Sequence, residues 1–195
     1  MPSKLKTPIV IAAASISALL FVGCAAEPQT PAKEPSGASS ATKTASTTSG
    51  PSCNPKVGAM APKLEIASMN GGGKVSIAPG KVTLIDFWAT WCAPCKTSFP
   101  QYQALYEKYK SKGLEVVAVS SDEPDEKGKI PAFIKETRAK FPVGWDHGHE
   151  IAGCWKPAAS PTAYIIDKKG IVRHIHNEWH PGDEKKLEEQ IKALL

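Results

Sequence analysis

Residues 82–95 read VTLIDFWATWCAPC, and this stretch decides the fold. Its first half, Val82 to Trp88, is an apolar run interrupted by Asp86, which is typical of a buried central strand. A helix is predicted to follow over residues 93–110, because apolar side chains recur there at intervals of three or four. These side chains are Phe99, Tyr102, Tyr106 and Tyr109. Pro100 lies within the segment and predicts a kink.

The two cysteines of this stretch stand where a strand gives way to a helix. Unpaired N–H groups and the positive end of the helix dipole meet at a helix N-terminus, so the pKa of Cys92 is expected to be lowered. Cys92 is then the attacking nucleophile, and Cys95, about one helical turn further on, resolves the mixed disulfide. Pro94 falls in the first turn, where its missing N–H costs little. The predicted chemistry is thiol–disulfide exchange.

Two other interpretations of this cysteine pair stay open. The spacing of Cys92 and Cys95 is also that of half a zinc site, although Cys53 and Cys154, the other thiols after residue 52, do not form a second such pair. A structural disulfide is the other alternative, but it would close a very small loop and stabilise the fold little. Because strand, motif and helix agree, redox activity is the favoured interpretation.

The rest of the sequence adds strands and helices around this centre. Strands are predicted at 63–67, 74–77, 114–120, 162–166 and 171–176, with glycine-containing turns at 71–73 and 168–170. A second amphipathic helix is predicted over residues 130–141, marked by Ile130, Phe133, Ile134, Thr137 and Phe141. Asp183 is predicted to cap a last helix, whose inner face is Leu187, Ile191 and Leu194. This order predicts an α/β fold with a mixed central β-sheet flanked by helices.

Residues 1–23 carry the features of an export signal peptide. Two lysines precede an apolar run at 9–22, which is shorter than the roughly 20 residues that a membrane-spanning helix needs. Residues 24–52 are rich in Ala, Ser, Thr and Pro and contain no aromatic residue. Such a segment cannot offset its ordering entropy, so it is predicted to be a disordered tether. Residues 53–195 suit one domain with one core.

The export signal ends in Leu20-Phe21-Val22-Gly23-Cys24. This resembles a bacterial lipobox, in which a small residue precedes a cysteine that is lipidated and becomes the mature N-terminus, although Phe21 stands where Leu is usual. An ordinary signal peptide cut elsewhere, or an uncleaved anchor, is the alternative. Several acyl chains on Cys24 would hold the domain at a membrane, which a single chain does only weakly. Ala25 in place of Asp favours the outer membrane, by resemblance to enteric lipoproteins.

Residues 86–95, DFWATWCAPC, resemble the active-site signature of thioredoxins, with Trp91 directly before the first cysteine. They are especially similar to the membrane-tethered TlpA/ResA-like branch of that family. Ser160-Pro161-Thr162, ahead of a predicted strand, resembles the family's cis-proline element. The resemblance covers roughly residues 62–195 and implies a thioredoxin-like fold for the whole domain.

The resemblance also implies roles for individual residues. It implies that Pro161 is cis and lies beside Cys92, where the preceding backbone pairs with an extended substrate chain. It implies that Asp86 is the buried acid that assists proton transfer at Cys95, and burial on a central strand is expected to raise the pKa of this carboxyl. A hydrogen-bonded core residue is the alternative for Asp86. Ser98 stands where ResA-like reductases usually carry Glu, which weakens a role in cytochrome maturation.

Two further cysteines and five histidines lie outside this motif. In an oxidising compartment, Cys53 and Cys154 are hypothesised to form a structural disulfide that ties the end of the tether to the domain. Two unpaired thiols, or a functional link from Cys154 to the active site, are the alternatives. His174 and His176 alternate on one predicted strand and so share a face. The other histidines are His147, His149 and His180. All five histidines are explained equally well as polar residues that face solvent. Neither a metal site nor a cofactor is therefore predicted.

The sequence therefore predicts an extracytoplasmic thiol–disulfide oxidoreductase, lipid-anchored in a bacterial cell envelope, that acts on protein substrates. Residues 93–94 (Ala-Pro) and Asp86 favour the reducing direction, and the family implies a membrane-bound thiol redox partner. A thiol peroxidase is a first alternative, and a copper carrier that uses the cysteine pair and His176 is a second. The net charge of +5, part of which lies in the export signal, does not indicate a nucleic-acid partner.

Overall fold

The computed structural model describes residues 52–195, and the predictions for the export signal, Cys24 and the tether up to residue 51 lie outside the described residues. The larger sheet has five strands in the order β5-β4-β3-β6-β7, and β1 and β2 form a separate hairpin. Strand β3 runs parallel to β4 and antiparallel to β6, so the sheet is mixed, as the sequence predicts. Between Ser52 and Leu195, no helix has both the length and the apolar composition to cross a membrane.

The secondary-structure elements follow one another along the chain in α/β order. The strands are β1 (Glu65–Ala67), β2 (Lys74–Ser76), β3 (Val82–Trp88), β4 (Leu114–Ser120), β5 (Val143–Trp145), β6 (Thr162–Ile166) and β7 (Val172–Asn177). The helices are α1 (Ala93–Tyr109), η1 (Lys110–Lys112), η2 (Lys127–Lys129), α2 (Ile130–Thr137), α3 (Glu150–Trp155) and α4 (Asp183–Leu194). The bounds of β3, β4 and β6 are those that the sequence predicts, and α1 continues through Pro100.

Two expectations for the helices are wrong. Helix α2 ends at Thr137 rather than at residue 141, because Arg138 takes the left-handed conformation with φ 56°. Asp183 does not cap α4: it is the first helical residue, and Gly182 with φ 101° is the N-cap. The Asp183 carboxylate instead accepts a hydrogen bond from the backbone N–H of His180 at 2.7 Å. Helix α3 and strand β5 were not predicted.

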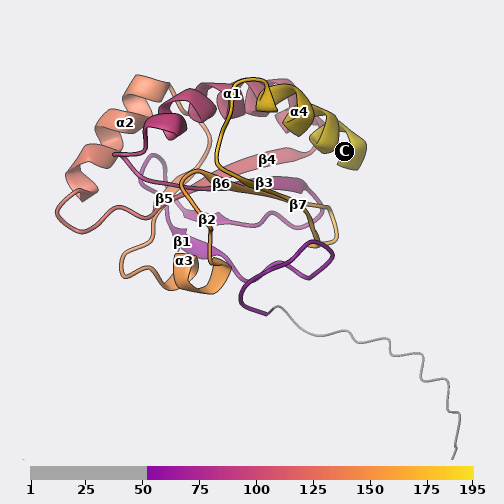
Figure 1. Ribbon diagram of the computed structural model, residues 1–195, viewed down its shortest axis with the longest axis horizontal. Coiled ribbons are helices and arrows are strands. Elements are labelled where there is room, and N and C mark those ends of the chain that lie inside the picture. Colours follow the sequence, from indigo (N-terminus) through magenta and orange to yellow (C-terminus); the bar gives the residue numbers. More distant parts are fainter. Residues whose placement is uncertain (1–51) are drawn as a thin grey trace, which may run out of the picture. The chain divides into compact units, whose positions relative to one another are not determined.

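The five-stranded sheet is covered on both faces. Helices α1, α2 and α4 lie over one face, and α3 and the β1–β2 hairpin lie over the other (Figure 1). Successive side chains of a strand point to opposite faces. On β3, Leu84 and Trp88 therefore pack under the helices α1, α2 and α4, whereas Ile85 and Phe87 pack toward α3 and the hairpin. Asp86 shares the face of Leu84 and Trp88, which places its carboxyl beneath α1.

Both outer strands of the sheet have partial backbone partners outside it. At one edge, Ser68, just after β1, forms an isolated bridge with Gly144 of β5. A Cβ on Gly144 would lie 2.2 Å from Ile66 Cδ1, so any larger residue there would force the Ile66 side chain of the hairpin to move. At the other edge, the N–H of Val172 in β7 donates to the carbonyl of Ala59 at 2.9 Å.

Candidate active site

The cysteine pair lies at the N-terminus of α1. Cys92 is the N-cap residue, and its Sγ accepts a hydrogen bond from the backbone N–H of Cys95 at 3.2 Å. The two sulfurs are bonded to each other, with an S–S distance of 1.99 Å. Pro94 occupies the first turn, where no intrahelical partner exists for its missing N–H. The Cys92 sulfur therefore faces the N–H groups and the positive dipole end of a helix, which favours a thiolate after reduction.

Trp91 is the large exposed side chain beside the cysteine pair. Cys92 is 3% exposed and Cys95 is fully buried, whereas Trp91 is 66% exposed. An exposed tryptophan beside a reactive sulfur provides a large apolar contact area for a partner. Trp91 thus offers the largest apolar side chain of the motif for substrate contact, and Ala93 and Pro94 are exposed beside it.

Asp86 is a buried acid on the face of the sheet that α1 covers. The hydroxyl of Tyr102 donates to its Oδ1 at 3.3 Å, and Oδ2 has no hydrogen-bond partner among residues 52–195. Burial raises the pKa of Asp86 well above its usual range, and the hydrogen bond from Tyr102 offsets this only in part. Burial, followed by the proximity of Asp86, likewise raises the pKa of Tyr102. The pair therefore holds its protons to a higher pH than the same groups would in water.

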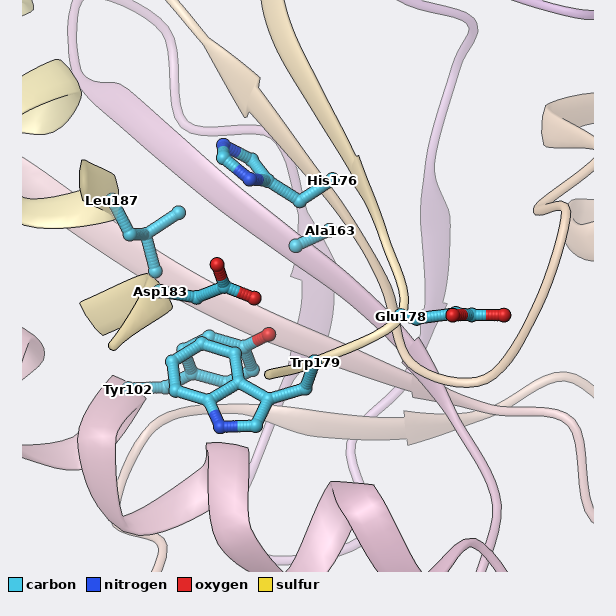
Figure 2. A pocket seen from close by; sticks show the side chains of 7 residues that line it. All are labelled: Tyr102, Ala163, His176, Glu178, Trp179, Asp183 and Leu187. Carbon is cyan, nitrogen blue, oxygen red and sulfur yellow. The ribbon is translucent and has the colours of Figure 1, made fainter. Parts of the chain in front are cut away.

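A small cavity adjoins Tyr102 (Figure 2). Its volume is about 10 Å³, close to the room that one water molecule needs. Tyr102 and Ala163 form part of the lining, and Ala163 is the cross-strand partner of Asp86. His176 and Asp183 line the same cavity from β7 and α4. The buried phenol and two polar groups from β7 and α4 thus line one small space.

Pro161 lies at the same end of the sheet as the cysteines. The Ser160–Pro161 peptide bond is cis, and Thr162, the first residue of β6, pairs with Phe87 of β3. This register places Pro161 at the end of β3 from which the chain leaves toward Cys92. The carbonyl of Pro161 accepts the N–H of Glu178 at 2.8 Å.

Cys53 and Cys154 are joined in a second disulfide, with an S–S distance of 2.14 Å. Cys53 is exposed, and Cys154 lies in α3, partly buried against the core on the face opposite α1. The N–H of Asn54 also donates to the carbonyl of Cys154 at 2.6 Å. This bond therefore attaches the beginning of the described chain to α3, away from the Cys92–Cys95 pair.

The histidines make separate local contacts. His176 Nε2 lies 2.7 Å from Gln190 Oε1, and His149 Nε2 lies 3.2 Å from Glu123 Oε1. Burial lowers the pKa of His174. No three His, Cys, Asp or Glu side chains of the described region gather as a metal site, so Cys92, Cys95 and His176 do not form one there. His147 packs edge-on against the Trp145 ring, and His180 lies 3.6 Å from the Asp183 carboxylate.

Two residues of the site were missed from the sequence. Tyr102 was identified only as a core residue of α1, although its spacing of seven from Cys95 places both on one helix face. Asp122 follows β4 and is 1% exposed, yet its carboxylate binds Thr90, two residues before Cys92. The signal for Asp122 was its place after a strand parallel to β3, because the carboxyl ends of parallel strands meet at one edge of a sheet.

Comparison with known proteins agrees with this geometry. A model of the AhpC/TSA family matches residues 57–175. The thiol-disulfide oxidoreductase ResA of Bacillus thuringiensis subsp. konkukian is 35% identical over 142 residues, which are 71% of this chain and 79% of that protein. ResA of Bacillus anthracis is 37% identical over the same shares of the two chains.

Solved structures agree with these sequence matches. The crystal structure of StoA from Bacillus subtilis has a TM-score of 0.56 and 26% identity, and covers 69% of this chain and 98% of that one. A crystal structure provisionally assigned to a thiol:disulfide interchange protein DsbE of Chlorobium tepidum has a TM-score of 0.66 and 34% identity, and covers 72% and 98%. By sequence and by fold, the chain belongs to the AhpC/TSA family and is a thioredoxin-like thiol–disulfide oxidoreductase akin to ResA.

Proposed function

We propose that this oxidoreductase reduces disulfides of protein substrates outside the cytoplasm, with Cys92 as the attacking thiol. The observation that carries the proposal is the position of Cys92 as the N-cap of α1, where its Sγ accepts the Cys95 N–H at 3.2 Å. A thiolate in this place is stabilised by the helix dipole and by a charge-assisted hydrogen bond. Cys95 lies close enough to complete the exchange, since the two residues are joined in the oxidised protein.

The reaction consists of two exchanges. The Cys92 thiolate attacks one sulfur of the substrate disulfide, so that a Cys92–substrate bond forms, the substrate S–S bond breaks, and the departing sulfur takes up a proton. Cys95 then loses its proton and attacks Cys92 Sγ, which restores the Cys92–Cys95 disulfide and releases the second substrate thiol. The substrate gains two electrons and the protein loses two. A membrane-bound thiol partner would return the protein to the dithiol state.

Asp86 is the proton acceptor for Cys95 in this scheme. Its carboxyl lies beneath the helix that carries Cys95, is fully buried, and has a pKa raised by that burial. A carboxyl of this kind keeps its proton to a higher pH than an exposed aspartate, which favours proton exchange with a thiol. Tyr102 holds one carboxyl oxygen and leaves Oδ2 for the proton.

Trp91 and Pro161 are the residues proposed to meet the substrate. Trp91 offers exposed apolar surface next to Cys92. Pro161 stands at the adjacent strand end, where the backbone before it is proposed to pair with an extended substrate chain. The pairing would supply affinity that does not depend on the substrate's side chains.

The reducing direction is tested by the reduction potential of the Cys92–Cys95 couple. We expect a value on the thioredoxin side of the scale, about −270 to −200 mV, and catalysed reduction of insulin disulfides when a chemical reductant is supplied. Equilibration with glutathione buffers, followed by alkylation and mass measurement, gives the potential. A value near the oxidant end, about −120 mV, would reverse the direction.

The anchor proposal concerns the part of the chain before residue 52. We infer that residues 1–23 are removed as a lipoprotein signal peptide and that Cys24 is acylated. Residues 24–52 then act as a tether, and the domain at 53–195 works on the periplasmic side of a membrane, the outer one being favoured by Ala25. The sequence Leu20–Cys24 supports this inference.

Lipidation of Cys24 has a direct test. A cell culture that produces the protein is fed a palmitate analogue, and the purified chain is assayed for the label. The wild type is expected to be labelled and to fractionate with membranes, whereas Cys24→Ser is expected to lose both properties because its acylation site is gone. Cys53→Ser serves as the matched control and keeps the label. Equal labelling of Cys24→Ser would contradict the anchor.

We further infer that the Cys53–Cys154 disulfide is structural. It closes a sequence separation of 101 residues, and a loop of this length contributes about 4–5 kcal/mol in the chain-entropy account. The double variant Cys53→Ala/Cys154→Ala is therefore expected to unfold with about 3–5 kcal/mol less free energy and a midpoint about 10 °C lower. Chemical and thermal denaturation of the oxidised proteins measure this.

The matched control for this prediction is the Cys92→Ser/Cys95→Ser pair. Its disulfide spans a sequence separation of only 3, so its loss is expected to change stability far less. Rates of disulfide reduction should stay unchanged in Cys53→Ala/Cys154→Ala. Equal stability of this variant and the wild type would remove the structural role.

A further inference from the structure

The loop between β3 and Cys92 is bound by one carboxylate, which comes from the residues after β4. Asp122, two residues beyond β4, accepts the backbone N–H of Thr90 at 2.9 Å on Oδ1 and 3.1 Å on Oδ2. The Thr90 hydroxyl donates to Oδ1 at 2.6 Å, and the Ser120 hydroxyl donates to Oδ2 at 2.6 Å. Thr90 is therefore held through both its backbone and its side chain.

Asp122 is itself held in place from neighbouring strands. Its backbone N–H donates to Ser120 Oγ at 3.1 Å, and its carbonyl accepts the Trp145 indole N–H, from the end of β5, at 2.8 Å. The N–H of Ser121, the residue before Asp122, donates to the carbonyl of Trp88 at 2.8 Å. With 1% of its surface exposed, Asp122 joins the ends of β3, β4 and β5 into one rigid contact.

We propose that Asp122 is a positioning residue of the exchange reaction, which fixes Thr90 so that Cys92 keeps its N-cap place when the disulfide is open. This rests on the proposed function, in which Cys92 is the attacking thiol. In the oxidised protein, the bond to Cys95 already fixes the Cys92 sulfur. In the dithiol that bond is absent, and the loop then depends on contacts that the oxidised protein already makes. These are the Cys92 N–H donating to Ala89 O at 3.1 Å and the contacts of Thr90 with Asp122.

The contact acts on the reaction through geometry. The Cys92 thiolate is stabilised only while its sulfur faces the Cys95 N–H and the start of α1. A loop that moves by about 1 Å can lose about 100-fold in rate, because a reacting atom must be held close to its attack position. Asp122 does not touch the sulfur, so its contribution is to keep the sulfur there.

The experiment compares four variants in one assay of insulin reduction by the fully reduced protein. Asp122→Ala is expected to reduce insulin about 10- to 100-fold more slowly and to form the Cys92 thiolate at higher pH, as followed by thiolate absorbance. Asp122→Asn keeps an oxygen acceptor for the Thr90 N–H and is expected to recover most of the loss. Thr90→Val keeps that N–H but loses the hydroxyl bond, and is expected to be about fivefold to tenfold slower.

The fourth variant, Asp146→Ala, is the matched control. Asp146 is buried at the end of β5 and binds the Ile151 and Ala152 N–H groups of α3 at 3.1 and 2.7 Å, without contact to the active-site loop. The Asp146→Ala substitution removes a buried carboxylate from the same edge of the sheet, so this variant shows the effect of lost stability alone. Its insulin reduction rate and its thiolate titration are expected to match the wild type.

Each result has one meaning. If Asp122→Ala folds and exchanges at the wild-type rate with an unchanged thiolate titration, the positioning role is wrong. If Asp122→Ala does not fold, Thr90→Val decides, and wild-type kinetics with an unchanged thiolate titration in that variant would equally overturn the positioning role. Cys92→Ser in the same assay separates the two proposals: residual exchange there removes the proposed function, whereas an inactive Cys92→Ser beside an unaffected Asp122→Ala removes only the positioning role.

Discussion

Cys92→Ser is expected to lose disulfide reduction down to the uncatalysed background, whereas Cys95→Ser stops halfway with the substrate attached. The difference follows from the geometry: Cys92 Sγ occupies the N-cap of α1 and begins the reaction, and Cys95 is needed only to release the product. A serine hydroxyl stays protonated at neutral pH and does not attack disulfides. A stable mixed disulfide with Cys95→Ser is therefore the signature of the proposed order.

Non-reducing electrophoresis and mass spectrometry detect the trapped species after incubation of each reduced variant with a protein disulfide. Cys53→Ala/Cys154→Ala is the control, because its missing disulfide lies on the opposite face of the sheet, and it should neither trap nor lose activity. If Cys92→Ser rather than Cys95→Ser accumulates the adduct, the roles of the two cysteines are exchanged.

Asp86→Asn is expected to make the protein more stable and less active at once. The carboxyl is buried with a raised pKa, so ionising it in the folded state is costly, and a neutral amide removes a cost on the order of a few kcal/mol at alkaline pH. The same substitution removes the proton acceptor for Cys95, and loss of general base catalysis slows exchange by about 100-fold or more. A purely structural Asp86 would not give effects of opposite sign.

The pH dependence of folding stability tests the direction of the Asp86 pKa shift independently of activity. In the unfolded chain, an aspartate has a pKa of about 3.9, whereas burial raises the pKa of Asp86 in the folded protein. The folded state thus holds this proton more tightly, so its contribution to stability is complete below the unfolded pKa and is lost as the pH rises through the folded pKa. Denaturation of the oxidised protein across a pH series should show this decline in the wild type and a shallower one in Asp86→Asn.

Tyr102→Phe refines the test of Asp86. Its hydroxyl donates to Asp86 Oδ1 and lowers the pKa of that carboxyl, so removing it should raise the pKa further and displace the stability decline to higher pH. The aromatic ring stays in the core, which keeps the change in packing small. A decline at unchanged pH in Tyr102→Phe, or a decline as steep in Asp86→Asn as in the wild type, would assign the titration to another group.

The parts of the fold that were predictable are the ones with a strong local pattern. Strands β3, β4 and β6 are buried on nearly every residue, so their apolar runs begin and end where the strands do. Helix α1 could be predicted from its spacing of aromatic residues, together with the cysteine motif at its start. These elements place Cys92, Cys95 and Asp86, which is why the reaction could be inferred from the sequence.

The parts that were missed lack such a pattern. Strand β5 has three residues, Val-Gly-Trp, and its pairing with β4 is a contact between distant parts of the chain. Helix α3 begins after His149, which is in the left-handed conformation with φ 59°. Its first N–H groups bind the Asp146 carboxylate, a contact that no capping motif in the sequence predicts. Asp122 belongs to the same class, since its role depends on Thr90, which is 32 residues away along the chain.

The backbone contacts at the two outer strands affect the tendency of this protein to aggregate at high local concentration. An open strand edge is a template for another chain, and its unpaired N–H and C=O groups promote aggregation. Here Gly144 lets the hairpin approach β5, and Ala59 occupies part of β7 through Val172. At high local concentration the protein therefore has less tendency to polymerise edge to edge. A bulkier residue at 144 would displace the Ile66 side chain and weaken that protection at β5.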